Sequence, residues 1–160
     1  MIAIHILCVG KIKEKFWKDA INEYSKRLSK YCRLDIVEVQ DSKIPDKTSI
    51  AMEKQIKDEE ANRIIDQLKK DTYIVCLDLN GKEYTSPEFS EKIQKLAVEG
   101  NSSITFVIGG TLGLGDEILE LAKEKICFSK MTFPHQLIRV FLLEQLFRGF
   151  KIANGETYHR

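Results

Sequence analysis

Apolar and polar positions along this chain alternate in blocks that predict strands and helices in turn. Short, mostly apolar runs predict strands, and the longer stretches between them repeat apolar positions at the helical period. The predicted strands cover residues 2–9, 34–39, 73–79, 104–108 and 126–128. The predicted helices cover residues 14–31, 48–70, 116–125 and 134–150, and a further helix opens at Ser86, its predicted cap. Asn80 and Gly81 predict a turn after the third strand.

The alternation of strand and helix predicts an α/β fold. Strands that are apolar on both faces are typical of a parallel sheet with helices on both faces. The sequence of 160 residues shows neither an internal repeat nor a flexible linker, so we expect a single domain over residues 1–160.

The last predicted helix departs from the usual amphipathic pattern. Its apolar residues extend nearly all the way round it: Leu137, Ile138, Val140, Phe141, Leu142, Leu143, Leu146, Phe147 and Phe150. A helix of this kind must be buried on most sides, and one domain of this size offers few places for that. We therefore expect a second copy of the chain to cover it, which predicts a homodimer.

Composition places the chain among ordinary globular proteins. Hydrophobic residues make up 43% and charged residues 31% of the sequence. No apolar run reaches the roughly 18–20 residues that a membrane span needs, and the amino terminus lacks the pattern of a signal peptide. The four cysteines, Cys8, Cys32, Cys76 and Cys127, form no CxxC pair. Scattered thiols favour a reduced cytoplasmic protein without a zinc or other metal site.

Charge is distributed unevenly behind a net charge of +1. Residues 1–33 hold eight Lys and Arg against three acids, and residues 131–160 hold four against two. The two basic ends would suit a nucleic acid if they met in space, whereas the alternative is a set of solvated helix faces. Because the net charge is near zero, any RNA would be recognised locally and by its shape.

Two loops at predicted strand ends could hold a flat ligand. A glycine pair at residues 109–110 follows one apolar strand, and residues 128–133 follow another. Because the carboxyl ends of parallel strands share one edge of a sheet, these loops predict a nucleotide-sized pocket there.

The second of these loops combines hydrogen-bonding and apolar side chains. Ser129 and Thr132 can bind the edge of an adenine, and Met131 and Phe133 can pack against a flat base. The alternative is a helix-capping loop, with Thr132 near the start of the last helix and Pro134 in its first turn. Capping and binding are compatible.

Neither familiar phosphate motif fits the glycines. Gly110 and Gly115 have the spacing of a P-loop, but Asp116 stands where that motif needs lysine. The dinucleotide fingerprint has Ile118 in place of its third glycine. A kinase or a dehydrogenase is therefore not predicted. The alternative to a ligand loop is that these glycines only make a tight turn.

Few polar residues interrupt the last helix. They are His135, Arg139, Glu144 and Arg148. Glu144 and Arg148 lie four residues apart and could form an ordinary surface pair. On so apolar a helix, however, polar groups favour a site or a dimer contact.

The chain ends in three side chains that suit work on RNA: Tyr158, His159 and Arg160. An aromatic ring can stack on a base, an imidazole can transfer a proton, and a guanidinium can pair with phosphate. A frayed terminus without a role is the alternative.

Taken together, these residues resemble the SPOUT superfamily of methyltransferases, and within it the RlmH type. The resemblance rests on Phe106 to Gly110, Gly113, Ser129 to Thr132, Pro134, His135, Arg139, Glu144, Gln145, Arg148 and Tyr158 to Arg160. The opening segment to Lys11 and the strand that ends at Asp78 also fit, so the resemblance spans essentially the whole chain. Gly149 is a mild departure, because a small alanine-like residue is more usual there.

The resemblance implies a fold and a cofactor. The fold would be a parallel sheet whose carboxyl-terminal third is threaded into a trefoil knot, in a protein that works as a homodimer. S-adenosylmethionine would bind in a bent shape among the knot loops. The residues that would contact it are Leu77, Gly109, Gly110, Phe128, Ser129, Lys130, Met131, Thr132 and Phe133.

The resemblance also implies a reaction on 23S ribosomal RNA. The methyl group would go to N3 of a pseudouridine in helix 69, without a metal, and we expect assembled ribosomes to be the substrate. Since N3 attacks well only as its proton leaves, His159 would act as base or proton relay. Tyr158 would stack on or orient the base, and Arg148 and Arg160 would hold RNA phosphate. Glu144 would position the tail or the acceptor, and the tail would complete the site of the opposite subunit.

Two other functions stay open from the sequence. One is a methyltransferase of the same fold that acts on another RNA, such as a tRNA ribose or base. The other is a non-catalytic module that binds RNA or a nucleotide. Methyl transfer to tRNA would favour the first, and failure to bind S-adenosylmethionine would favour the second.

Overall fold

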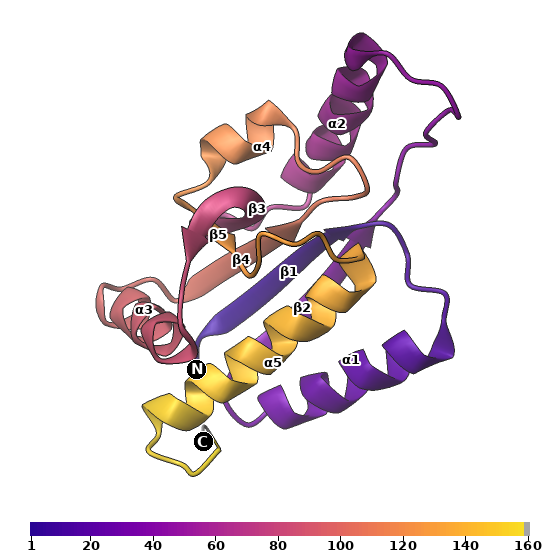
Figure 1. The fold of residues 1–160 in the computed structure, drawn as a ribbon. Helices are drawn as coiled ribbons and strands as arrows, with labels where there is room; N and C mark the ends of the chain where they lie inside the picture. Colours follow the sequence, from indigo (N-terminus) through magenta and orange to yellow (C-terminus); the bar gives the residue numbers. More distant parts are fainter. Residues whose placement is uncertain (159–160) are drawn as a thin grey trace.

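The protein is described here by a computed structural model that covers residues 1–158 (Figure 1). Strands and helices alternate along the chain as the sequence predicts. Their bounds are β1 Ala3–Val9, α1 Lys15–Leu28, β2 Arg33–Val39, α2 Ile50–Ile65, β3 Tyr73–Glu83, α3 Ser86–Val98, β4 Ser103–Ile108, α4 Asp116–Leu121, β5 Glu124–Cys127 and α5 His135–Ala153.

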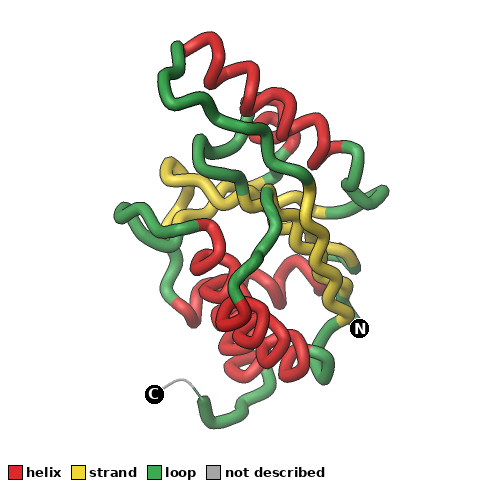
Figure 2. The backbone as a smooth tube through the Cα atoms, turned by 90° about the vertical axis from the view of Figure 1, so that its right-hand side faces the viewer, coloured by secondary structure: helices red, strands yellow, loops and turns green. Residues whose placement is uncertain are grey.

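The strands form one five-stranded sheet in the order β2-β1-β4-β3-β5. Every pairing between these strands is parallel, which confirms the predicted parallel sheet. Helices α1, α3 and α5 cover one face, and α2 and α4 cover the other (Figures 1 and 2). The α/β fold with helices on both faces is therefore confirmed, whereas the trefoil knot stays a prediction.

The core follows the alternation of side chains along each strand. In β1, Ile4 and Ile6 face α1, α3 and α5, whereas Leu7 and Val9 face α2 and α4. Each apolar side chain buried in this way stabilises the fold by about 1.5–3 kcal/mol. The cysteines Cys8, Cys32, Cys76 and Cys127 are free, buried thiols, and the first three belong to these two core layers.

Helix α5 lies between α1 and α3 across the sheet (Figure 1). Leu142, Leu143 and Leu146 are no more than 1% exposed. One chain alone therefore buries this side of the helix, without the second copy that the apolar pattern led us to expect. Two apolar residues on its outer side, Leu137 and Phe141, stay half-buried. The homodimer stays a prediction, with this outer side as the surface available to a second copy.

Several helix ends differ from the predictions. Helix α2 ends at Ile65 rather than near residue 70, and Asp71 then turns the chain with a positive φ of 57°. Helix α3 is capped by Thr85 rather than Ser86, because the Thr85 side chain and Glu88 form a reciprocal capping box. The Ser86 hydroxyl instead donates to Gln145 Oε1 of α5 at 2.6 Å.

The other ends shift by a few residues. Helix α1 ends at Leu28 rather than Tyr31, and α4 ends at Leu121. Helix α5 begins at His135 and continues to Ala153, with Pro134 at its N-cap position and no side-chain cap bond. The alternative of a capping loop, with Thr132 near the helix start and Pro134 in the first turn, is therefore wrong.

The turn predicted at Asn80 and Gly81 is also wrong. Strand β3 continues to Glu83, and both Leu77 and Lys82 align with Ile126 of β5, so the strand bends between them. Gly81 permits this bend by a close approach, because an added Cβ would lie 2.6 Å from the backbone N and C of Ile126. A glycine is needed at position 81 because the backbone of β5 comes close to it, and not because the chain turns there.

Replacing Gly81 by alanine should destabilise the protein. The new Cβ would press on the β5 backbone, and we expect the free energy of unfolding to fall by about 1–3 kcal/mol. Gly149→Ala is the matched control, since its Cβ would meet Ser90 at an ordinary 3.6 Å. Urea unfolding of both variants checks this; equal stability of the two would contradict the close approach.

Candidate functional site

The register of the sheet brings the predicted cofactor residues to one edge. In β3, Cys76 aligns with Val107 of β4, and the next residue, Leu77, aligns with Ile126 of β5. Gly109 and Phe128 each follow their aligned residue by two positions. Leu77, where β3 begins to bend, therefore shares the carboxyl edge of the sheet with the loops after β4 and β5, as predicted for a ligand site.

The glycine loop after β4 is a tight turn. Gly110 and Gly113 form an isolated antiparallel bridge, and the Gly113 N–H donates to the Gly110 carbonyl at 3.1 Å. A Cβ on Gly109 would lie 2.8 Å from the Gly113 backbone, and Gly113 has a φ of 89°. These glycines are thus required by the turn itself, and ligand binding by the same turn stays a prediction.

The loop between β5 and α5 presents a mixed surface. The Ser129 hydroxyl accepts from the Met131 N–H at 3.0 Å, which closes a local turn. Met131 is 73% exposed, and Lys130 and Thr132 are exposed beside it. Phe133 is half-buried and meets the ring of Phe141 edge-on, with 5.4 Å between centroids. The loop therefore offers a polar backbone and an exposed apolar side chain to a ligand.

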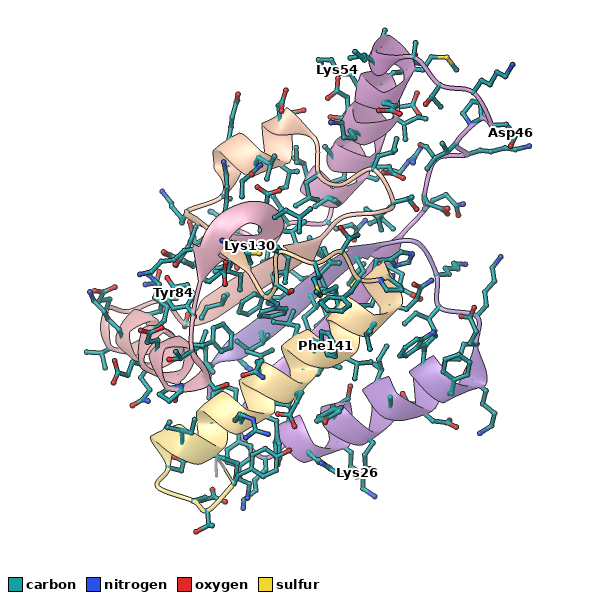
Figure 3. The ribbon with its side chains drawn as sticks, in the orientation of Figure 1. Lys26, Asp46, Lys54, Tyr84, Lys130 and Phe141 are labelled. Carbon is teal, nitrogen blue, oxygen red and sulfur yellow. The ribbon has the colours of Figure 1, made fainter. Side chains whose placement is uncertain are left out.

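A cavity of about 310 Å³ lies next to this loop. Its lining residues are Tyr84, Thr85, Ser86, Phe89, Ile126, Cys127, Phe128, Phe141 and Gln145. Among the predicted cofactor residues, Phe128 alone is a lining residue of this cavity. Figure 3 labels Tyr84, Lys130 and Phe141, which approach this region from three different segments.

Tyr84 lines this cavity but is not among the site residues predicted from the sequence. Its hydroxyl donates a hydrogen bond to Glu124 of β5. Burial is the main cause that raises the pKa of the Tyr84 phenol, and this hydrogen bond raises it further. Only the bend of β3 brings Tyr84 to β5, so no local sequence signal pointed to it. A larger groove of about 750 Å³ lies between α1 and β2, and none of the predicted cofactor residues lines it.

The predicted catalytic residues Glu144, Arg148 and Tyr158 lie together. Glu144 Oε1 accepts from the Tyr158 hydroxyl at 2.5 Å and from the Tyr24 hydroxyl at 3.1 Å. Glu144 Oε2 accepts from Arg148 Nε at 3.1 Å, and the Arg148 guanidinium lies 4.6 Å from the centre of the Tyr158 ring. Burial and the Glu144 carboxylate raise the pKa of both phenols, so both tyrosines stay hydrogen-bond donors at neutral pH.

The chain end is bound to the body of the protein as far as Tyr158. Glu156 accepts from Lys151 Nζ at 2.6 Å and from the Tyr31 hydroxyl at 2.9 Å. The Tyr158 ring meets Phe147 edge-on at 5.0 Å. The alternative of a frayed terminus is therefore wrong as far as Tyr158. His159 and Arg160 lie outside the described residues.

The cavity and the Glu144 cluster use different parts of α5. Phe141 and Gln145 line the cavity, and Gln145 accepts from Ser86 at the start of α3. The neighbouring Glu144 instead accepts from Tyr24 of α1. The two halves of the predicted site therefore lie on different sides of α5 within one protomer.

Arg139 has a structural role. Its side chain is 3% exposed, pairs with Glu38 Oε2 at 2.7 Å and donates to the Gly10 carbonyl at 2.7 Å. A buried charge with these partners fixes α5 against the ends of β1 and β2, because breaking such a pair is costly. At the start of the same helix, burial and then the positive charge of Arg139 lower the pKa of His135.

Within residues 1–158, no group of three or more His, Cys, Asp or Glu side chains is placed to hold a metal ion. Over the same residues, no helix is long and apolar enough to cross a membrane.

A family model described as "Predicted SPOUT methyltransferase" matches residues 2–159. The chain belongs to the SPOUT methyltransferase family. Relatives named "Ribosomal RNA large subunit methyltransferase H" come from Clostridium acetobutylicum (57% identical), Clostridium botulinum strain Langeland (57%) and Clostridium tetani (54%). Each match covers 98% of this chain and 99% of the relative.

Solved structures support the fold of the SPOUT family. A methylase family protein from Neisseria gonorrhoeae is 12% identical with a TM-score of 0.55, covering 99% of this chain and 87% of that one. A methylase family protein from Haemophilus influenzae is 13% identical with a TM-score of 0.51, covering 98% and 70%. At these identities the likeness concerns the fold alone.

His135 should make folding pH-dependent. Because its pKa is lowered below the usual 6.5 in the folded state, the unfolded chain takes up its proton first as the pH falls. His135 therefore favours the folded state above pH 6.5, and this contribution is lost as the pH drops below it. Urea unfolding at about pH 7.5 and 5.5 should show a smaller loss for His135→Gln than for the unaltered protein. Equal losses would contradict the lowered pKa.

Proposed function

We propose that this protein transfers a methyl group from S-adenosylmethionine to large-subunit ribosomal RNA, at N3 of a pseudouridine in helix 69 of 23S rRNA. The observation that carries the proposal is the 57% identity to a relative named ribosomal RNA large subunit methyltransferase H, over 98% of this chain and 99% of that relative. A match of this extent covers the strand-end loops and the Glu144 cluster alike. With ribosomes as its substrate, the protein would act in the cytoplasm.

The carboxyl edge of the sheet fits the cofactor. The residues that would hold it are Leu77, Gly109, Gly110, Phe128, Ser129, Lys130, Met131, Thr132 and Phe133. Of these, Phe128 lines a cavity of about 310 Å³, within the usual range of about 300–1,000 Å³ for ligand pockets. Backbone amides and carbonyls of residues 128–133 suit an adenine edge, and Met131 offers exposed apolar surface. When bound, the cofactor supplies an already activated methyl group, so the protein has to place the acceptor and remove its proton.

The chain end supplies the groups for the acceptor. His159 takes the N3 proton as base or relay, and Tyr158 stacks on or orients the base. Arg148 and Arg160 hold RNA phosphate. Glu144 fixes the orientation of Tyr158, which the 2.5 Å hydrogen bond between them supports.

A second copy of the chain completes the site. In one protomer, Tyr158 is bound to Glu144 beside α1, whereas the cofactor loops lie at the carboxyl edge of the sheet. Pairing two chains across the half-buried outer side of α5, which includes Leu137 and Phe141, would let each tail reach the cofactor of its partner. This arrangement gives a reason for the half-buried outer side of α5 and for the bound tail.

The deciding experiment is methyl transfer from labelled S-adenosylmethionine to purified ribosomes that lack the modification. Label at N3 of the helix 69 pseudouridine is the expected result, with little transfer to naked rRNA. Transfer to tRNA instead would identify a methyltransferase with another substrate. Absence of cofactor binding would identify a non-catalytic RNA- or nucleotide-binding module.

His159→Ala should lower kcat on ribosomes by about 10²- to 10⁴-fold, the usual contribution of a general base. The affinity for S-adenosylmethionine should not change, because the cofactor loops are untouched. Single-turnover kinetics and equilibrium dialysis measure the two quantities. Wild-type turnover at saturating substrate would remove His159 from the reaction.

Mixing two inactive variants tests whether the site is shared between chains. Thr132→Trp, an exposed position in the cofactor loop, is combined with His159→Ala after loss of cofactor binding by Thr132→Trp is confirmed. Random pairing should restore about a quarter of the sites, because half of the dimers are mixed and each has one intact site. No recovery after subunit exchange would show that each tail serves its own chain.

A further inference from the structure

We propose that Tyr24 of α1 and Tyr31, just after it, are positioning residues that fix the chain end for methyl transfer. The chain end, here residues 154–158, leads directly to the predicted base His159. The catalytic part of this inference rests on the proposed function, whereas the structural part stands on the contacts of the described residues.

Tyr24 reaches the chain end through a shared carboxylate. Its hydroxyl donates to Glu144 Oε1 at 3.1 Å, and the Tyr158 hydroxyl donates to the same oxygen at 2.5 Å. Arg148 holds the other oxygen, Glu144 Oε2, at 3.1 Å. Donors from α1, α5 and the chain end therefore meet on one carboxylate, and the position of that carboxylate sets the position of Tyr158.

Tyr31 binds the chain end directly at Glu156, two residues before Tyr158. Its hydroxyl lies 2.9 and 3.1 Å from the two carboxylate oxygens of Glu156, and Lys151 Nζ lies 2.6 Å from Glu156 Oε2. These hydrogen bonds and the nearby positive charge lower the pKa of Glu156, so the acceptor stays ionised at neutral pH. The Tyr31 ring stacks on Phe150 with 5.7 Å between centroids.

Two attachment points fix a direction as well as a place. Glu156 is bound by Tyr31, just after α1, and Tyr158 is bound through Glu144, which Tyr24 of α1 also contacts. The helix is itself seated on α5, and the Arg27 guanidinium lies 5.4 Å from the Tyr24 ring and 5.8 Å from Phe147. A segment held at these two points keeps Glu156 and Tyr158 in one orientation, as a preorganised site requires.

The two hydroxyls can be removed without removing the rings. In Tyr24→Phe and Tyr31→Phe the aromatic contacts stay, including the Tyr31–Phe150 stack, and only the bonds to Glu144 and Glu156 are lost. This separates positioning from packing. Tyr73→Phe is the matched control, because Tyr73 lies at the start of β3, beside Lys92 of α3.

The first measurement is release of Tyr158 by carboxypeptidase, followed by mass spectrometry. We expect the Tyr24→Phe, Tyr31→Phe double variant to lose Tyr158 about tenfold faster than the unaltered protein, the scale of a lost hydrogen bond to a charged group. The second measurement is methyl transfer to ribosomes. There we expect kcat to fall by about tenfold while KM for S-adenosylmethionine and the melting temperature stay close to those of Tyr73→Phe.

Release of Tyr158 at the unaltered rate would overturn the inference. A fall in kcat accompanied by equal losses in cofactor affinity and melting temperature would also overturn it, since that pattern marks a purely structural role. If the unaltered protein methylates no ribosomes, the proposed function fails, and the carboxypeptidase result still decides whether the tyrosines hold the chain end.

Discussion

Burial of α5 against the sheet is the constraint on which both halves of the candidate site depend. Leu142, Leu143 and Leu146 fasten the helix to the face of β1 and β4, and each fully buried leucine contributes about 1.5–3 kcal/mol. The helix begins where the cofactor loop ends and finishes where the chain end begins. A shift of α5 would therefore move the loop of residues 128–133 and the Glu144 cluster together.

Polar contacts set where along the sheet α5 sits, which apolar packing alone would leave loose. Arg139 pairs with Glu38 and donates to the Gly10 carbonyl, while Gln145 accepts from Ser86 at the start of α3. These contacts join the helix to segments far away in the sequence. They favour the observed register of α5, because breaking the Arg139–Glu38 pair would leave a buried charge without that partner.

The pattern of apolar residues predicted the elements well because strands and helices depend on local periodicity. It failed where distant segments decide the outcome. Asn80 and Gly81 look like a turn until β5 lies against them. The cap of α3 is a different case, because the Thr85–Glu88 box that decides it is local. The Glu144–Arg148 pair was visible from its spacing, but Tyr24, 120 residues before Glu144, was visible only as an apolar position of a helix.

The buried cysteines have a consequence for the chemistry of the protein outside catalysis. Desolvation raises the pKa of the Cys8 and Cys76 thiols to about 12 and that of Cys32 to about 11. At neutral pH these sulfurs are almost wholly protonated, and the thiol is a far weaker nucleophile than the thiolate. The folded enzyme should therefore resist alkylating agents and mild oxidants at these positions. The rate of reaction at Cys8 would therefore measure how often the centre of the sheet becomes exposed to water.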